Sequence, residues 1–324
     1  MTMVLDGLEQ WGGVPVASQA AFPTPIFGKH WFVDGTNGSD GNSGLSKLEP
    51  MATIQAAVTD QIANPTGIGD AIWIFPGTYV ESVTGDLTDV SLIGACAHSP
   101  GAAKITPSDG SAYRGTLLRA AIRNLSLANS SSTSTTYASL SMVSMTDSLV
   151  DNCHIVGVYN ASDTTGIRIG TEGTSIDWEI MGTSRISNCM WTHSGTMLNN
   201  HEYGLVFGLT GSTSKANKRM FRYSEICYNH IYAEKQGIEV NLTSANGSGG
   251  SIHHNVIGSG QFNGNCSGWG ITATESGEED QLIKVYANYI NSADCIKNFK
   301  AGNVYGNFVS LDGATPDTEN PAKS

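Results

Sequence analysis

Carboxylate side chains close to tryptophan and tyrosine are the residues of this sequence best suited to do chemistry. The candidate carboxylates are Asp177, Glu179, Glu202, Glu225, Glu239 and Glu275, and the aromatic residues near them are Trp178, Tyr203 and Trp269. Two carboxylates about 6.5–9.5 Å apart can hydrolyse a glycosidic bond, one as acid and one as base. Aromatic rings beside them can stack on sugars. Each carboxylate can equally be an exposed charge on a strand, so the catalytic residues stay unknown at this stage.

Histidine and cysteine are the other chemically capable residues. His253 and His254 are adjacent in SIHHNV. Because neighbouring strand residues face opposite ways, we interpret them as a ladder residue and a corner residue rather than as a metal site. The six cysteines stand far apart without a C-x-x-C pair, which is untypical of zinc sites and of a disulfide framework. We therefore expect buried thiols, no metal site and no cofactor.

The glycine-rich loop from Asp34 to Gly44 invites a calcium interpretation. Its oxygen-bearing side chains include Asp34, Asn37, Asp40 and Asn42. An EF-hand needs a glutamate at position twelve, but counting from Asp34 gives Leu45 and counting from Asp40 gives Met51. We interpret the loop as tight turns between a strand and a helix, with calcium at some of these oxygens left open as an alternative.

Short elements follow from the pattern around this loop. HWFVDG, residues 30–35, predicts a strand, and PMATIQAAVTDQIA predicts a helix over 50–63 that starts at Pro50. Its apolar residues recur at spacings of three and four, which gives one apolar face. AIWIFPGTYVESV then predicts two strands around a Pro-Gly turn, and VSLIG predicts another at 90–94.

The rest of the chain is a loose repeat. An asparagine followed by a short apolar strand recurs at Asn124, Asn152, Asn188, Asn229, Asn255, Asn288 and Asn307. Between these repeats a glycine begins an alternating strand at Gly166, Gly204, Gly237 and Gly270. Intervals of 19 to 41 residues between the asparagines exclude a helical repeat and favour a parallel β-helix with loops of varied length. We expect each asparagine to take a left-handed corner and to stack its amide from coil to coil.

The segments FVDGTNGSDGNSGLSKLEPMATIQAAV, GDAIWIFPGTYVESV and VSLIGA resemble the opening of the pectate-lyase-like right-handed parallel β-helices. The resemblance covers residues 33–94 in motif and about 30–310 in architecture. It implies an all-β fold, a right-handed parallel β-helix that forms a single-stranded solenoid of about nine coils. A short N-terminal capping helix and an extended N-terminal arm complete it. The expected domains are an arm at 1–29, the β-helix at 30–310 and a polar C-terminal tail at 311–324.

The activity does not follow from this resemblance, because the superfamily includes lyases, hydrolases, esterases, epimerases and virion spikes. The N-x-D, D-D, G-H-G and R-I-K signatures of its galacturonan hydrolases are absent. Asp151, Asp163 and Asp177 are scattered rather than clustered as calcium-binding lyases require. The aspartate pair of pectin methylesterases has no evident counterpart.

Composition excludes several partners. The formal net charge is −12, from 17 basic and 29 acidic residues, which argues against nucleic acid. No run approaches the roughly 20 apolar residues that would insert in a membrane. The first residues, MTMVLDGLEQWGG, lack the basic and apolar regions of a signal peptide.

These observations favour a structural virion protein of a tailed bacteriophage, a spike, fibre or capsid decoration on the exterior of the particle. We expect a homotrimer that binds other virion proteins through its Pro- and Gly-rich arm and takes bacterial surface polysaccharide as a further partner. The alternative is a polysaccharide-degrading enzyme, a lyase or glycoside hydrolase of the same fold.

Overall fold

A computed structural model describes most of the chain. The described residues are 28–67, 69–96, 99–130, 138–157, 165–170, 181–193, 201–208, 221–240, 249–258, 266–273, 282–297, 299 and 301–310. The predicted arm, apart from its last two residues, and the predicted C-terminal tail lie outside these ranges, as do Asp163, Asp177, Trp178, Glu179 and Glu275.

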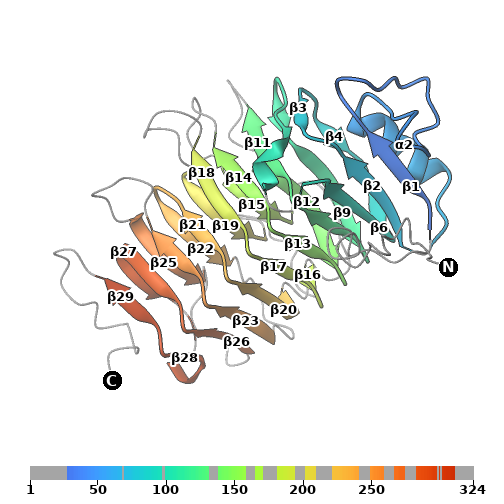
Figure 1. The fold of residues 1–324 in the computed structure, drawn as a ribbon. Coiled ribbons are helices and arrows are strands. Elements are labelled where there is room, and N and C mark those ends of the chain that lie inside the picture. The colour runs from blue at the N-terminus through green and yellow to red at the C-terminus, as the bar shows by residue number, and fades with distance from the viewer. Residues whose placement is uncertain are drawn as a thin grey trace, which may run out of the picture.

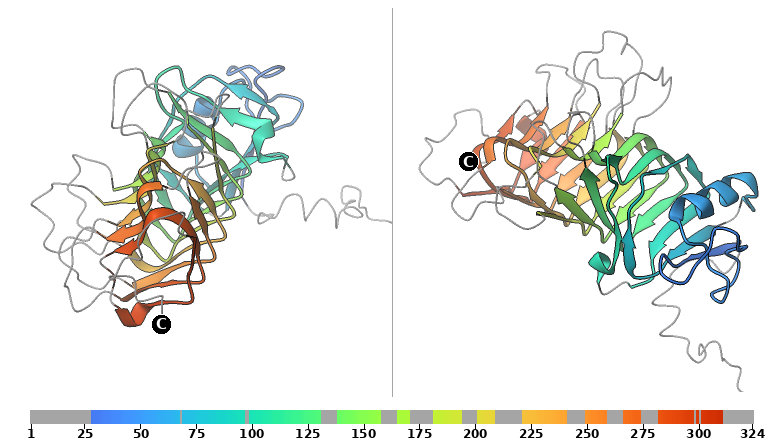
Figure 2. Two further views of the ribbon diagram at one scale, coloured as in Figure 1. Left: turned by 90° about the vertical axis from the view of Figure 1, so that its left-hand side faces the viewer. Right: turned by 90° about the horizontal axis from the view of Figure 1, so that it is seen from above.

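The described chain is a right-handed parallel β-helix, as the sequence predicts (Figure 1). Its strands stack in three ladders along the rod (Figure 2). The pairings between the coils are parallel, whereas β8 (Gly110–Ser111) pairs antiparallel with β11.

The first ladder consists of β1 (His30–Val33), β2 (Asp70–Ile74), β6 (Val90–Gly94), β10 (Ala121–Arg123), β13 (Leu149–Asp151), β17 (Arg185–Ser187), β20 (Phe221–Cys227), β23 (Gly249–His253), β26 (Leu282–Tyr286) and β28 (Val304–Tyr305). The second consists of β3 (Gly77–Tyr79), β7 (Ala103–Ile105), β11 (Ser126–Ser130), β14 (His154–Gly157), β18 (Met190–His193), β21 (His230–Tyr232), β24 (Val256–Gly258), the start of β27 (Tyr289–Lys297) and β29 (Phe308–Ser310). The third consists of β4 (Val83–Thr84), β5 (Leu87–Thr88), β9 (Tyr113–Leu118), β12 (Ala138–Thr146), β15 (Thr165–Ile169), β19 (Tyr203–Phe207), β22 (Gln236–Val240), β25 (Cys266–Ala273) and the end of β27, with β16 (Met181–Gly182) between β12 and β20.

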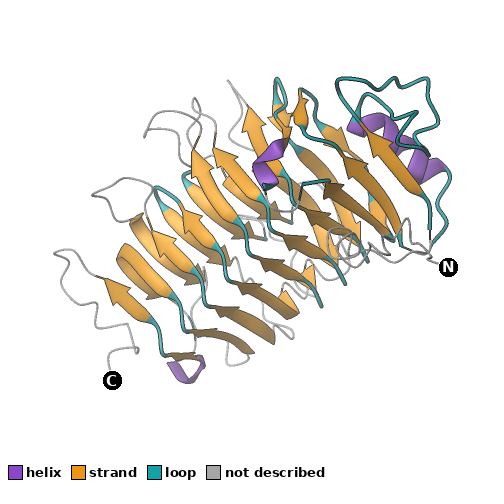
Figure 3. Cartoon of the chain, viewed as in Figure 1, coloured by secondary structure: helices purple, strands orange, loops and turns teal. Residues whose placement is uncertain are grey.

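One α-helix, α2 (Ile54–Ala63), lies at the N-terminal end of the rod (Figure 3). It packs against β1, β2, β4 and β5 and buries Ile54 and Val58, so it closes that end of the core as predicted. Two 3-10 turns, η2 (Pro100–Ala102) and η3 (Ala301–Asn303), complete the helical elements of the described chain.

The predicted start of the helix at Pro50 is wrong. Met51 is still extended, because its N–H donates to the Phe32 carbonyl and its own carbonyl accepts from Asp34. The helix begins after Thr53, whose side chain accepts a hydrogen bond from the Ala56 N–H. A threonine at this position satisfies one of the free N–H groups of the first turn, and this sets where the helix can start.

The recurring asparagines occupy two different positions of the coil. Asn124, Asn152 and Asn188 have φ angles of 58°, 51° and 55° and form the left-handed corner, as predicted. From Asn229 onward the corner belongs to the preceding residue, and the corner residues of these coils are Tyr228, His254, Ala287 and Gly306. The predicted corner role is therefore wrong for the later asparagines.

The later asparagines are buried inside the rod and form a column that we call the inner asparagine column: Asn229, Asn255, Asn288 and Asn307. The Oδ1 of each of the last three accepts hydrogen bonds from the backbone N–H and the Nδ2 of the asparagine one coil earlier, at 2.9–3.1 Å. The predicted stacking of amides is confirmed here. Cys153 and Cys189 take the equivalent place in earlier coils, and the thiol of Cys153 donates to the Ile122 carbonyl.

The recurring glycines have a packing role. A Cβ on Gly237 would lie 2.3 Å from the Ile257 side chain and 2.5 Å from the carbonyl oxygen of Gly270. Gly204 is in the same situation against Ile231. The missing side chain thus lets an isoleucine of the second ladder fill the core beside the third ladder, which explains the Gly-strand repeat.

No helix in the described part of the chain is long and apolar enough to cross a membrane.

Candidate functional site

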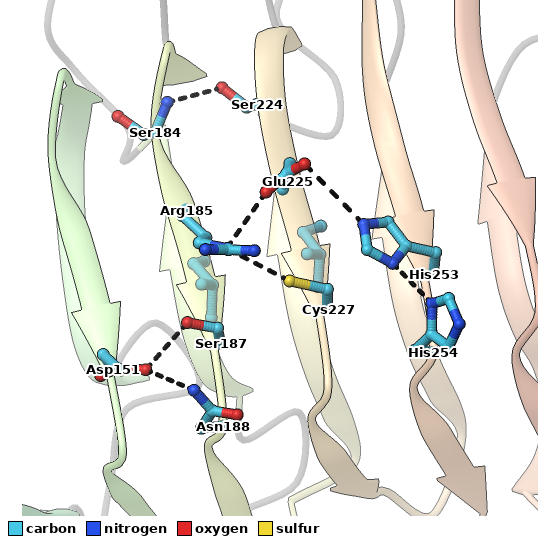
Figure 4. A network of polar contacts seen from close by, with 12 residues as sticks. Asp151, Ser184, Arg185, Ser187, Asn188, Ser224, Glu225, Cys227, His253 and His254 are labelled. Carbon is cyan, nitrogen blue, oxygen red and sulfur yellow. Dashed lines mark hydrogen bonds and ion pairs between the residues drawn. The ribbon is translucent and has the colours of Figure 1, made fainter.

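A polar cluster lies on the outer face of the first ladder, and we call it the Glu225 cluster: Arg185, Glu225, Cys227, His253 and His254 (Figure 4). It follows from the pairing register of three successive coils. Arg185 pairs with Glu225 across β17 and β20, and Cys227 pairs with His253 across β20 and β23. The intervening isoleucines are buried, so these alternate residues point outward.

Glu225 is the centre of the cluster. Its Oε2 lies 3.1 Å from Arg185 Nε, and its Oε1 lies 3.9 Å from His253 Nε2. Arg185 Nε also donates to the Cys227 thiol at 3.4 Å. The Glu225 side chain keeps 44% of its surface exposed, whereas that of His253 keeps 8%. A solvent-accessible carboxylate is therefore held between a cation and a buried imidazole.

Burial sets the protonation of His253 and Cys227, the two groups next to Glu225. It lowers the pKa of His253, and the nearby Glu225 carboxylate offsets only part of that effect. Burial raises the pKa of the Cys227 thiol more than the Arg185 guanidinium lowers it. At neutral pH the imidazole is therefore neutral and Cys227 is a thiol.

The two histidines are a ladder residue and a corner residue, as predicted, yet their rings meet. His253 Nδ1 lies 2.8 Å from His254 Nδ1, so one of the two nitrogens donates a hydrogen bond to the other. The expectation that adjacent residues face opposite ways does not hold here. His254 has a φ of 54°, and this left-handed corner turns its side chain back toward His253.

A second polar group adjoins the Glu225 cluster one coil earlier. The Asp151 carboxylate accepts hydrogen bonds from Ser187 Oγ at 2.9 Å and Asn188 Nδ2 at 2.8 Å (Figure 4). These bonds fix Asp151 beside the strand of Arg185. The face therefore carries the carboxylates of Asp151 and Glu225, with the Arg185 guanidinium on the coil between them.

Aromatic side chains continue the face toward the C-terminal end. The His253, Tyr286 and Tyr305 rings are paired in register and stacked, with centroids 4.8 and 5.1 Å apart. Tyr228 stacks on His254 at 5.1 Å and keeps half of its surface exposed. We call Tyr228, Tyr286 and Tyr305 the tyrosine row.

The other predicted carboxylates do not join this site. Glu202 forms an ion pair with Lys235 at 2.8 Å, beside Tyr203 of the third ladder. Glu239 is buried on β22, also in the third ladder, and Trp269 of β25 lies under the Lys297 ammonium. Asp177, Trp178, Glu179 and Glu275 lie outside the described residues, so the structure says nothing of them.

The loop at 34–44 is occupied by its own hydrogen bonds. Asp34 accepts from the N–H groups of Thr36 and Asn37, which lowers its pKa together with the Asn37 side chain. Asp40 accepts from the backbone N–H groups of Ala52 and Thr53 at the start of α2. The prediction of tight turns into the helix agrees with these bonds, and the calcium alternative stays a prediction.

Arg185 and Cys227 are the site residues that sequence reasoning missed. They stand 42 positions apart and meet only through the coil register. Arg185 directly precedes ISNCMW and Cys227 opens CYNHIY, and this place before the corner is the available signal, because outward residues at that point of successive coils must stack.

The fold of this chain is shared with solved enzymes of the parallel β-helix class. A pectin methylesterase from Aspergillus niger superposes with a TM-score of 0.57 at 13% identity, covering 93% of this chain and 91% of that one. A pectin methylesterase from carrot gives 0.54 at 13% identity, covering 93% and 89%. No family model matches the chain, and no curated protein matches it by sequence. Identity this low shows the fold alone.

Proposed function

We propose that this protein is a carbohydrate-active enzyme. It would bind an extended polysaccharide along the outer face of the first ladder and use Glu225 as the catalytic group that cleaves it. The observation that carries the proposal is the half-exposed Glu225 carboxylate, which Arg185 and His253 hold on a face that the tyrosine row continues. It favours the polysaccharide-degrading alternative over the virion role.

The geometry suits a long ligand that runs parallel to the rod. Side chains repeat about every 4.8 Å from coil to coil, so such a ligand would meet an ordered series of polar and aromatic groups. Tyr228 offers an exposed ring surface for sugar C–H groups. Arg185 offers a cation to a hydroxyl or carboxylate oxygen of the sugar.

Glu225 is the group placed to exchange a proton with a glycosidic oxygen or a sugar carbon. The carboxylate reaches solvent, while the cation fixes one of its oxygens. His253 is neutral at pH 7 and can accept a proton from Glu225 or return one to it once the 3.9 Å gap closes. Cys227 is a weak nucleophile in this site because burial keeps it protonated.

The fold is compatible with this substrate class. Two solved proteins that share it are pectin methylesterases. The virion role depends on the arm at 1–29, nearly all of which lies outside the described residues, so it stays a prediction, as do the homotrimer and the phage partners.

A polysaccharide screen tests the proposal. The full chain is incubated with plant and bacterial polysaccharides, and three products are followed: new reducing ends, unsaturated-uronate absorbance and released methanol. We expect one of the first two, with a loss of at least about 100-fold in Glu225→Gln, the range of acid–base catalysis. The matched control is Glu49→Gln, an exposed glutamate of the N-terminal loop.

Two results would overturn the proposal. Turnover that is equal in the wild type and in Glu225→Gln would remove Glu225 from the reaction. Release of methanol without chain cleavage would make the protein an esterase rather than a polysaccharide-cleaving enzyme.

A further inference from the structure

We propose that Glu225, Cys227 and His253 form a binding site for a divalent transition-metal ion, of which zinc is the best match. This inference goes beyond the proposed function and does not rest on it. When the ion is bound it would occupy the gap between Glu225 Oε1 and His253 Nε2, so the proton exchange between these two groups would belong to the metal-free protein. One oxygen, one sulfur and one nitrogen donor from two adjacent strands all lie within 4.8 Å of one another.

An unsatisfied nitrogen points to a missing ligand. His253 Nε2 is buried and has no hydrogen-bond partner among the described residues, although it faces Glu225 Oε1. A buried polar atom without a partner destabilises the folded protein. An ion between these atoms would satisfy both of them.

The histidine pair sets the required tautomer. When the proton lies on His253 Nδ1 it is donated to His254 Nδ1, 2.8 Å away, and Nε2 then carries a free lone pair. Metal-binding histidines usually donate their second N–H in this way, which fixes the ring and raises its basicity. His254 therefore acts as the supporting residue of the site.

The distances fit a tetrahedral ion after small movements. With zinc bonds of about 2.0–2.1 Å to nitrogen and oxygen, two such ligands stand about 3.4 Å apart. Glu225 Oε1 and His253 Nε2 are 3.9 Å apart. The exposed side of Glu225 leaves a fourth position for water, as in zinc sites with three protein ligands.

Arg185 does not block the site. Its Nε contacts the opposite carboxylate oxygen, Oε2, and the Cys227 thiol, from the coil on the other side of Glu225. On binding, the ion would take the place of the proton on the Cys227 thiol, and Glu225 Oε1, which Arg185 does not contact, would bind the ion.

Titration with cobalt and zinc tests the site on the full chain without polysaccharide. We expect one equivalent of Co²⁺ to bind with a thiolate-to-cobalt charge-transfer absorption, and one equivalent of Zn²⁺ to displace it. Cys227→Ser should abolish the absorption, and His253→Gln should weaken binding at least about 10-fold. His254→Ala should cost about 10–100-fold, as expected for a supporting residue.

The matched control is Cys96→Ser, which removes a partly exposed thiol elsewhere in the chain and should bind like the wild type. Circular dichroism checks that every variant folds. The proposal is overturned if the wild type binds no stoichiometric ion, or if its cobalt complex shows no charge-transfer absorption. Undiminished binding by both Cys227→Ser and His253→Gln would overturn it as well. A failed metal titration leaves the polysaccharide proposal intact, because the screen is independent of it.

Discussion

Replacing Asn255 by alanine should lower the free energy of unfolding by about 2–6 kcal/mol. Asn255 Oδ1 accepts from the backbone N–H of Asn229 at 3.1 Å and from its Nδ2 at 3.0 Å. Its own Nδ2 donates to Asn288 Oδ1 and to the Ile226 carbonyl, both at 2.9 Å. All three asparagines are buried.

The size of the loss in stability follows from the hydrogen-bond donors that the substitution leaves without an acceptor. The Asn229 N–H and one Nδ2 hydrogen lose their acceptor inside the rod, and each unsatisfied buried donor costs about 1–3 kcal/mol. The sum is a large part of the 5–15 kcal/mol that stabilises a typical domain. Water cannot rescue these groups without opening the coil.

Urea unfolding followed by circular dichroism and tryptophan fluorescence measures the change. The matched control is Asn188→Gly, which alters an asparagine one position earlier in the coil register. Asn188 has a φ of 55° that glycine adopts freely, so the expected change is below about 1 kcal/mol. A loss below about 0.5 kcal/mol in Asn255→Ala, or equal losses in both variants, would refute the account of the inner asparagine column.

Three further outcomes follow from the structure. Gly237→Ala should cost about 1–3 kcal/mol, because its Cβ would overlap Ile257; Gly302→Ala, where a Cβ meets nothing within 4 Å, should leave the urea midpoint unchanged. Burial lowers the pKa of His201 to about 3, so between pH 6.5 and that value the unfolded chain binds a proton that the folded chain refuses. From pH 7 to pH 5 the wild type should therefore lose about 2 kcal/mol more than His201→Gln, and parallel pH profiles would contradict this. Asp40→Ala should cost about 1–2 kcal/mol, because the N–H groups of Ala52 and Thr53 just before α2 lose their carboxylate acceptor. The loss should be equal in calcium and in chelator; a calcium-dependent loss would instead favour the calcium alternative.

The architecture was predictable because its cause lies in local residue types. Asparagine before an apolar strand and glycine at the start of an alternating strand recur together in the four coils that begin at Asn152, Asn188, Asn229 and Asn255, and each has a backbone or packing reason. The division of the asparagines into two positions was also readable. The buried Trp191 stands three positions after Asn188, whereas the buried Ile231 stands two positions after Asn229. A single motif for all of the repeats does not distinguish these two positions of the asparagine.

The site was not predictable to the same degree, because it depends on register between coils rather than on neighbours in the chain. Loops of different lengths separate Arg185, Glu225 and His253, so counting residues does not show that they stack. The orientation of His254 depends on the left-handed corner that it occupies. Asparagine takes this corner in earlier coils, and a histidine in the sequence does not indicate such a corner. Composition and spacing alone therefore give Glu225 as one of six candidate carboxylates and do not show its partners.

The inner asparagine column makes the later coils interchangeable modules. From Asn229 to Asn307 each asparagine offers the same amide to the coil before it and needs the same amide from the coil after it. Duplicating or excising the segment between two of these asparagines would therefore leave every junction chemically matched. Gain or loss of one coil would therefore change the length of the rod by about 4.8 Å and leave the hydrogen bonds of the inner asparagine column intact.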